Sequence, residues 1–158
     1  MKKNDEKTSV DIAQKRFILC DETPFHAKEA YKALRTNVMF SMPGGGCKCV
    51  GVTSAMPSEG KSTTAINLSI SLAQIGKRVL LIDADMRRPA LSRLMVEKAN
   101  PGLSEVLGGL VTSREAVRKD IYPNLDILFS GDTPPNPSEL LGSETMQELI
   151  EEIWEGAK

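Results

Sequence analysis

The chain has 158 residues, a length typical of one domain, with 41% apolar and 26% charged residues, as in soluble globular proteins. Its net charge of −1 argues against a dedicated nucleic-acid-binding protein, which normally has a basic excess. No apolar run approaches the roughly 20 residues of a membrane-spanning helix. The polar start is unlike a secretory signal, and the odd number of cysteines, three, favours a reducing compartment. We therefore expect a cytoplasmic protein.

The sequence predicts a polar N-terminal arm over residues 1–25 and a folded domain over residues 26–158. The arm contains one short apolar patch, Phe17–Leu19. Apolar residues then recur at helical spacing, which predicts an amphipathic helix over residues 26–40. A glycine-rich loop at residues 43–46 should end this helix.

A strand, a helix and a second strand are predicted next along the chain. The apolar run Cys49–Thr53 predicts the first strand, and residues 61–75 predict a helix that Gly76 ends. The unbroken apolar run Val79–Ile82 is typical of a strand that is buried on both faces of a parallel sheet. Together these elements would form a right-handed βαβ unit.

The second half of the chain has weaker patterns. Short helices are predicted at Leu103–Leu107 and Ser113–Arg118, and a strand at Leu125–Phe129. The proline-rich segment Gly131–Pro137 should be a loop. Apolar residues at helical spacing predict a last helix over residues 143–155, with an acidic outer face. The whole pattern indicates a single α/β domain.

The segment Ser54–Thr63 lies where a phosphate-binding loop would join a strand to a helix. Lys61 would reach the phosphates, the Ser62 hydroxyl would bind Mg²⁺, and Gly60 would give the backbone its freedom. Ala55 stands where the common loop motif has its first glycine, and the alternative is that Gly-Lys-Ser starts an ordinary helix. The residues expected to bind the nucleotide are consecutive: Pro57, Ser58, Glu59, Gly60, Lys61, Ser62 and Thr63.

Two aspartates, Asp83 and Asp85, follow the second predicted strand. The carboxyl ends of parallel strands open on the same crevice, so both side chains would lie beside the phosphate loop. There they could hold Mg²⁺ or take up a proton. The alternative is that they only cap the next helix.

Three separated segments resemble the cytoplasmic domain of the bacterial tyrosine kinases that serve polysaccharide synthesis and export. The segments are Ser54–Thr63, Val79–Pro89 and Pro134–Leu141, and the resemblance spans roughly residues 25–155. It implies a three-layer P-loop NTPase-type fold with a mostly parallel sheet, which binds ATP and Mg²⁺. It also implies an autophosphorylating protein-tyrosine kinase that regulates exopolysaccharide or capsule synthesis.

The resemblance assigns roles to four residues. Lys61 and Ser62 would serve ATP and Mg²⁺, with Lys61 part of the catalytic set. Asp83 would be the catalytic base, and Asp85 would lie near the metal ion.

The resemblance also implies partners. The family has an E-x-x-R-x-x-R face on its early helix for contacts between subunits, and here Glu29, Lys32 and Arg35 occupy it, with lysine in place of the first arginine. Lysine cannot form the bidentate contact that arginine makes. A transmembrane activator of the polysaccharide system would be a further partner, and it would hold the chain at the inner face of the membrane.

The chain departs from the family pattern in its last part. No apolar strand ending in aspartate follows Phe129, and no tyrosine-rich tail is present, since the tyrosines are Tyr31 and Tyr122. The chain is therefore expected to be the N-terminal portion of the kinase domain, and its own catalysis stays open.

Two other functions compete with the kinase. Partitioning and division-site ATPases share the P-loop branch but carry a signature lysine where this chain has Met56. A non-catalytic nucleotide-binding or interaction module is the second.

Cys47 and Cys49 lack a second ligand pair for zinc, and His26 is expected to be solvated. Arg87-Arg88 could contact phosphate or a subunit, or could be solvated.

Overall fold

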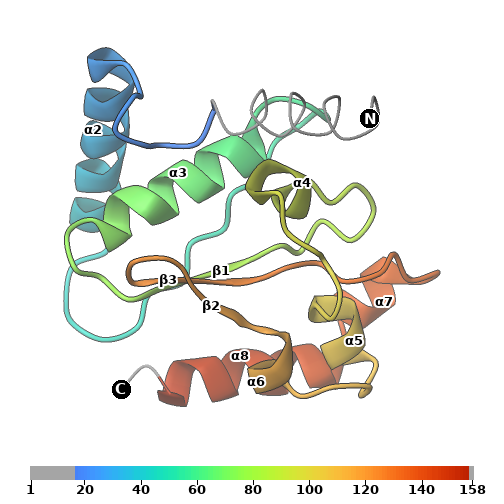
Figure 1. Cartoon of the computed structure of the whole chain (residues 1–158). Coiled ribbons are helices and arrows are strands. Elements are labelled where there is room, and N and C mark those ends of the chain that lie inside the picture. Colours follow the sequence, from blue (N-terminus) through green and yellow to red (C-terminus); the bar gives the residue numbers. More distant parts are fainter. Residues whose placement is uncertain (1–16, 157–158) are drawn as a thin grey trace, which may run out of the picture.

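The computed structural model describes residues 17–156, which form three layers: a small sheet between two sets of helices (Figure 1). Its helices are α2 (Phe25–Ser41), α3 (Lys61–Ala73), α4 (Leu91–Met95), α5 (Leu103–Leu107), α6 (Ser113–Ala116), α7 (Pro137–Leu141) and α8 (Glu144–Gly156). Its strands are β1 (Val79–Ile82), β2 (Arg118–Tyr122) and β3 (Leu125–Leu128). Helices α2, α3 and α4 lie on one side of the sheet, and α6 and α8 lie on the other. This arrangement confirms the predicted three-layer α/β class.

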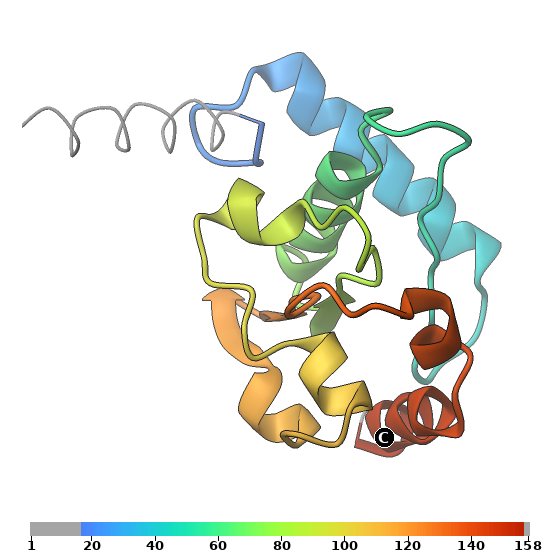
Figure 2. The same ribbon diagram turned by 90° about the vertical axis from the view of Figure 1, so that its right-hand side faces the viewer.

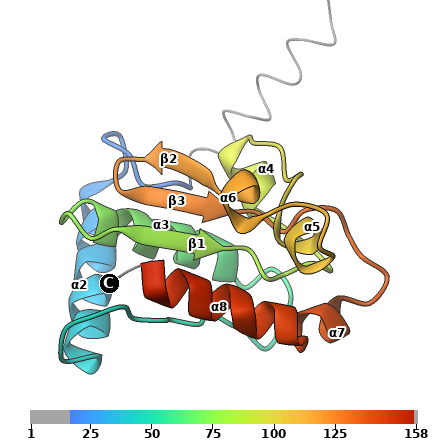
Figure 3. The same cartoon turned by 90° about the horizontal axis from the view of Figure 1, so that it is seen from below.

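The sheet has the order β1-β3-β2, so β3 is its central strand (Figure 3). β1 runs parallel to β3, with Val79 opposite Leu125 and Ile82 opposite Leu128, whereas β2 is antiparallel to β3. The ladder continues past β1, because the Asp83 N–H donates to the Leu128 carbonyl at 2.9 Å. This bond fixes the backbone where the predicted aspartates begin.

The core consists of two clusters, one on each face of the sheet. Side chains alternate between the faces of a strand, so consecutive residues of β3 contribute to different clusters. The cluster toward α3 and α4 contains Leu19, Ile66, Ile70, Ala73, Leu91, Leu125, Ile127 and Phe129. The cluster toward α5, α6 and α8 contains Met86, Leu103, Val106, Leu107, Ala116, Leu128 and Leu149.

The apolar patch of the predicted N-terminal arm packs onto α3. Leu19 is only 6% exposed. Asn67, buried in the middle of α3, accepts a hydrogen bond from the Leu19 N–H and donates one to the Phe17 carbonyl, both at 2.8 Å. We call residues 17–23 the strap. Residues 1–16 of the predicted arm lie outside the described residues, and the division at residue 25 stays a prediction.

Helix α2 confirms the helix predicted over residues 26–40, although none of its residues is buried. It lies beside α3 on the outside of the molecule (Figure 2). The Arg35 guanidinium joins the two helices by donating to the Ser71 carbonyl at 2.8 Å and to the Ser71 hydroxyl at 3.2 Å. Phe25 and Phe40 remain 77% and 81% exposed.

The strand predicted at Cys49–Thr53 is absent, and that prediction was wrong. This segment has no strand assignment, and Val50 and Val52 are 45% and 38% exposed. A strand is defined by hydrogen bonds to a neighbour, and no described strand pairs with this segment. The predicted βαβ unit across residues 49–83 therefore does not form, and β1 instead pairs with β3.

The remaining predictions hold in part. Gly76 follows α3 with φ of 78°, and α5, β3 and α8 are confirmed. The helix predicted over Ser113–Arg118 ends at Ala116, because the chain turns into the edge strand β2. The short helices α4 and α7 had no predicted counterpart. Within residues 17–156, no helix combines the length and apolar character needed to cross a bilayer.

Candidate functional site

The loop that leads into α3 has a backbone conformation suited to binding an anion. Ser58 and Gly60 have φ angles of 66° and 86°. Left-handed residues next to right-handed ones turn successive N–H groups toward one side and create a concave anion site. A Cβ on Gly60 would meet no atom within 4 Å, so glycine serves the backbone angle there and not the space.

The N-terminus of α3 is open to a ligand. Gly60 precedes the helix, no side chain caps it, and its first turn contains no acidic residue. The first N–H groups of a helix lack partners within the helix and lie at the positive end of its dipole. Ser62 and Thr63 lie in this first turn, half-buried. The helix end and the loop therefore present adjacent donors.

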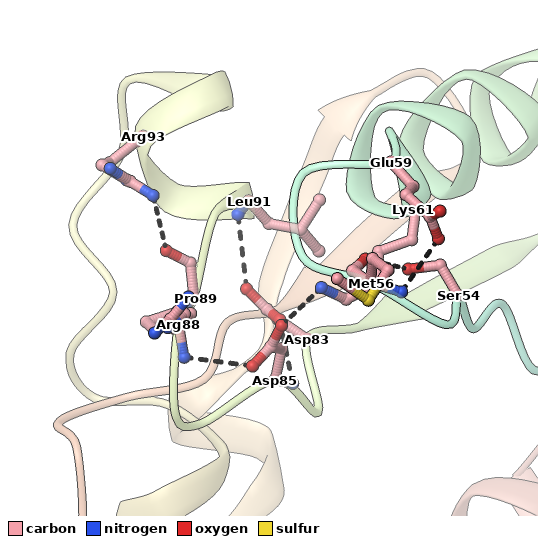
Figure 4. Close-up of polar contacts among 10 residues, drawn as sticks. All are labelled: Ser54, Met56, Glu59, Lys61, Asp83, Asp85, Arg88, Pro89, Leu91 and Arg93. Carbon is pink, nitrogen blue, oxygen red and sulfur yellow. Dashed lines mark hydrogen bonds and ion pairs between the residues drawn. The ribbon is translucent and has the colours of Figure 1, made fainter.

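The structure brings Lys61 and Asp85 together, as Figure 4 shows. The Lys61 Nζ lies 2.7 Å from the Asp85 Oδ2, and both side chains are partly exposed. The hydrogen bond from Lys61 lowers the pKa of the Asp85 carboxyl, against the opposing effect of burial. Asp85 therefore stays ionised beside the start of α3.

Asp83 lies deeper than Asp85 and is 5% exposed. Its two oxygens accept N–H groups of Asp85, at 3.2 Å, and of Leu91 at the start of α4, at 3.3 Å. Burial raises the pKa of the Asp83 carboxyl more than these hydrogen bonds lower it. The two neighbouring carboxyls thus have pKa values shifted in opposite directions, an arrangement typical of acid–base sites.

The loop is closed on itself by two contacts. The Glu59 Oε2 accepts the Met56 N–H at 3.0 Å, and the Ser54 hydroxyl donates to the Met56 carbonyl at 3.0 Å (Figure 4). Pro57 and Ser58 are exposed between them. The phosphate-loop motif allows any residue at the position of Glu59, so the sequence does not predict this contact.

The segment after Asp85 connects the site to α7. The Arg88 N–H donates to the Asp85 Oδ1 at 3.0 Å, while its side chain is exposed. The Arg87 guanidinium donates to the Ser138 hydroxyl of α7 at 2.8 Å. Ser138 belongs to the segment Pro134–Leu141 that contributes to the family resemblance, so sequence singles out this segment but not its contact.

The predicted subunit face lies on α2. Glu29 and Lys32 form an exposed ion pair at 2.8 Å, and Arg35 contacts Ser71 of α3. These contacts do not bring the three residues to the phosphate loop.

Residues 17–156 contain no group of three or more His, Cys, Asp or Glu side chains that could hold a metal ion. Mg²⁺ in nucleotide sites is usually bound through one or two carboxylates together with the phosphates, and such a site needs no acidic cluster. The assignment of Ser62 and Asp85 to Mg²⁺ stays a prediction.

Known proteins match this chain over most of its length. The Bacillus subtilis tyrosine-protein kinase YwqD is 43% identical over 139 residues, which cover 88% of this chain and 59% of that protein. The Streptococcus pneumoniae tyrosine-protein kinase CpsD is 35% identical over 92% of this chain and 62% of its own length. The chain thus spans about three fifths of these curated relatives.

Solved structures agree with the sequence matches. The kinase domain of the Escherichia coli tyrosine kinase ETK has a TM-score of 0.78 and 34% identity, over 84% of this chain and 52% of that one. The chimerical protein CapA2B2 has a TM-score of 0.74 and 36% identity, over 81% and 56%. The model of the AAA domain family matches residues 50–155, more than half of the chain. The curated relatives that it matches are named as bacterial tyrosine-protein kinases, and this chain belongs to the AAA domain family.

Proposed function

We propose that this chain is the ATP-binding part of a bacterial protein-tyrosine kinase of an exopolysaccharide or capsule system. The observation that carries this proposal is the meeting of Lys61, at the uncapped start of α3, with Asp85 and Asp83 at the end of β1. A cation, free backbone donors and two carboxylates with opposite pKa shifts suit the binding and transfer of a phosphoryl group. The kinase names of the relatives support the same reading.

The residues present fit ATP and Mg²⁺. The loop N–H groups and Lys61 are donors for phosphate oxygens, and the Ser62 hydroxyl and the Asp85 carboxylate are the hard oxygen ligands that Mg²⁺ prefers. When bound, Mg²⁺ would neutralise charge on the phosphates. Asp83, whose raised pKa is due to burial, would hold the proton of the attacking tyrosine hydroxyl.

Calorimetric titration of ATP into the wild type and Lys61→Met tests the nucleotide site. We expect the substitution to weaken binding by about 2–4 kcal/mol, as when one partner of a charge pair is truncated. Lys77→Met, at an exposed position beyond α3, is the matched control and should leave the affinity unchanged. Equal affinity of the wild type and Lys61→Met would contradict the proposal.

A nucleotide-binding module without phosphoryl transfer is the second candidate. The unpaired segment 49–53, which leads into the phosphate loop, favours it, because a strand would hold that loop more rigidly. ATP turnover measured beside ATP affinity separates the two candidates: both predict binding, and only the kinase predicts phosphorylated tyrosine. A partitioning-type ATPase is disfavoured by Met56.

Membrane association through a transmembrane activator is part of the proposal. An activator that favours the nucleotide-binding state must tighten ATP binding, and ATP must tighten activator binding by the same factor. Residues 1–16 mix basic and acidic side chains, which attract anionic lipid weakly. We expect no pelleting with protein-free anionic vesicles at physiological salt, and substantial pelleting would contradict this route.

Subunit association through Glu29, Lys32 and Arg35 is also proposed. Glu29 and Lys32 are exposed on α2 and available to a second copy. Arg35 would have to exchange its contact with Ser71 for one across the interface. Sedimentation of the wild type and Arg35→Ala with ATP checks this: the variant should associate less.

A further inference from the structure

Two carboxylates in this structure bind donor groups that would otherwise be available to phosphate oxygens. The Asp85 Oδ2 lies 2.7 Å from the Lys61 ammonium. The Glu59 Oε2 accepts the Met56 N–H, a backbone donor of the loop, at 3.0 Å. Figure 4 shows both contacts beside the loop that leads into α3. Each carboxylate therefore takes a place that a phosphate oxygen could take.

Asp85 depends on Lys61 for its charge balance. Its other oxygen accepts the Arg88 N–H, and its own N–H donates to Asp83, a second carboxyl. If Lys61 turned to a phosphate, Asp85 would face Asp83 and the phosphate charges without its cation. Like charges at such short range repel, unless another cation enters.

Glu59 is in a different situation. It is exposed, and its contact with Met56 lies within the loop, three residues away. The carboxylate leaves this N–H simply by swinging into solvent. Its competition with a phosphate should therefore not depend on a metal ion.

We propose that Glu59 and Asp85 are internal substitute anions, which hold the phosphate-binding groups of the resting site until a ligand replaces them. This inference rests on the proposed function, in which the loop binds ATP. A ligand binds a protein more weakly when its site is open only part of the time, in proportion to the open fraction. Removing either carboxylate should therefore strengthen the binding of ATP under the conditions in which that carboxylate competes.

The two carboxylates have distinct expected signatures. Glu59→Ala should bind ATP more tightly both in Mg²⁺ and in EDTA, by about three- to tenfold, the net worth of one ordinary hydrogen bond, because Glu59 is exposed. Asp85→Asn should bind more tightly in EDTA alone, by about two- to fivefold, as for a partly exposed ion pair. The ratio of the ATP affinity in Mg²⁺ to the ATP affinity in EDTA should therefore be smaller in Asp85→Asn than in the wild type. In Glu59→Ala this ratio should be unchanged.

The experiment is a calorimetric titration of the full chain with ATP, in Mg²⁺ and in EDTA. Glu148→Ala, which removes an exposed carboxylate of α8, controls for net charge. Amide hydrogen exchange of the unliganded protein is a second readout, and the Met56 amide should exchange faster in Glu59→Ala than in Glu148→Ala.

The outcomes separate this inference from the proposed function. Binding of ATP by the wild type, with unchanged or weakened affinity in Glu59→Ala, overturns the role of Glu59. An unchanged Met56 exchange rate overturns it as well. Equal weakening of Asp85→Asn with and without Mg²⁺ overturns the role of Asp85. Absence of ATP binding in every variant overturns the proposed function itself.

Discussion

Glu105, at the start of α5, joins two turns of backbone at the end of β3. Its carboxylate accepts the Gly102 N–H at 2.7 Å, the Ser104 hydroxyl at 2.9 Å and the Asp132 N–H at 3.0 Å. Burial by itself would raise the pKa of Glu105, but these hydrogen bonds outweigh it and lower the pKa. The charged form of Glu105 therefore stabilises the fold.

Glu105→Gln should lower the free energy of unfolding by about 1–3 kcal/mol at neutral pH, because its amide group would face backbone N–H donors. A carboxyl with a lowered pKa contributes stability above its ordinary value of 4.5, and this stability is lost as the pH falls through the folded value. The difference between the two proteins should therefore shrink in acid. Urea unfolding across a pH series checks this, and a difference independent of pH would contradict it.

Substitutions at Gly131 and Gly76 distinguish the cost of an unfavourable backbone angle from the cost of steric crowding. Both have positive φ angles, 79° and 78°. A Cβ on Gly131 would collide with Glu105 and Ser104, whereas one on Gly76 would meet nothing within 4 Å. We expect Gly76→Ala to cost about 1–2 kcal/mol of stability and Gly131→Ala about 2–5 kcal/mol. Equal losses in thermal melts would show that crowding at Gly131 is relieved.

At the scale of the elements, the Asn67 side chain links the strap to α3 by hydrogen bonds, in addition to the packing of Leu19 in the core. Asn67→Ala removes both hydrogen bonds to the strap and leaves the Leu19 N–H without its acceptor. We expect a loss of about 2–3 kcal/mol and faster hydrogen exchange at the Leu19 amide. Asn37→Ala, on the exposed side of α2, is the control and should leave exchange at Leu19 unchanged. Protection of Leu19 in Asn67→Ala would mean that apolar packing holds the strap.

Long elements can be predicted from sequence because their periodic patterns are long. Helices α2, α3 and α8 each have at least 13 residues. Helices α4, α5 and α7 have only five residues each, so their patterns are weak, and only α5 is among the predicted elements. Strand β2, with the sequence RKDIY, has little apolar character and exists because β3 offers it an edge. The segment 49–53 has the composition of a strand but lacks the neighbour that would make it one.

The candidate site also has a part that the sequence predicts and a part that it does not. The sequence is enough to single out Gly60, Lys61, Asp83 and Asp85 as candidates, because a phosphate site requires particular residue types at short spacing, and their roles stay a prediction. The contacts Glu59–Met56, Arg87–Ser138 and Asp83–Leu91 depend on how loops fold back in space. Residue types alone do not specify such folding.

For the whole molecule, the unpaired edge of β1 is the feature that most favours association between chains. Within residues 17–156, β1 pairs along one edge only, and Val50 and Val52 are exposed in the segment 49–53, which belongs to no strand. Free strand edges and exposed apolar side chains favour association between chains. We expect concentration-dependent self-association, reduced in the double variant Val50→Lys, Val52→Lys. Sedimentation equilibrium checks this, and a monomer at all concentrations would contradict it.

The central position of β3 also has a kinetic consequence. β3 supplies side chains to both core clusters, and its pairing with β1 joins Val79 to Leu125 across a long stretch of chain. Parallel pairing between distant segments closes a large loop, and the entropy of closing it is lost before the stabilising contacts form. We therefore expect slow folding, with the pairing of β1 and β3 formed in the transition state. Substitutions in β3, such as Ile127→Val, should slow folding, whereas substitutions in the peripheral α2 should mainly speed unfolding.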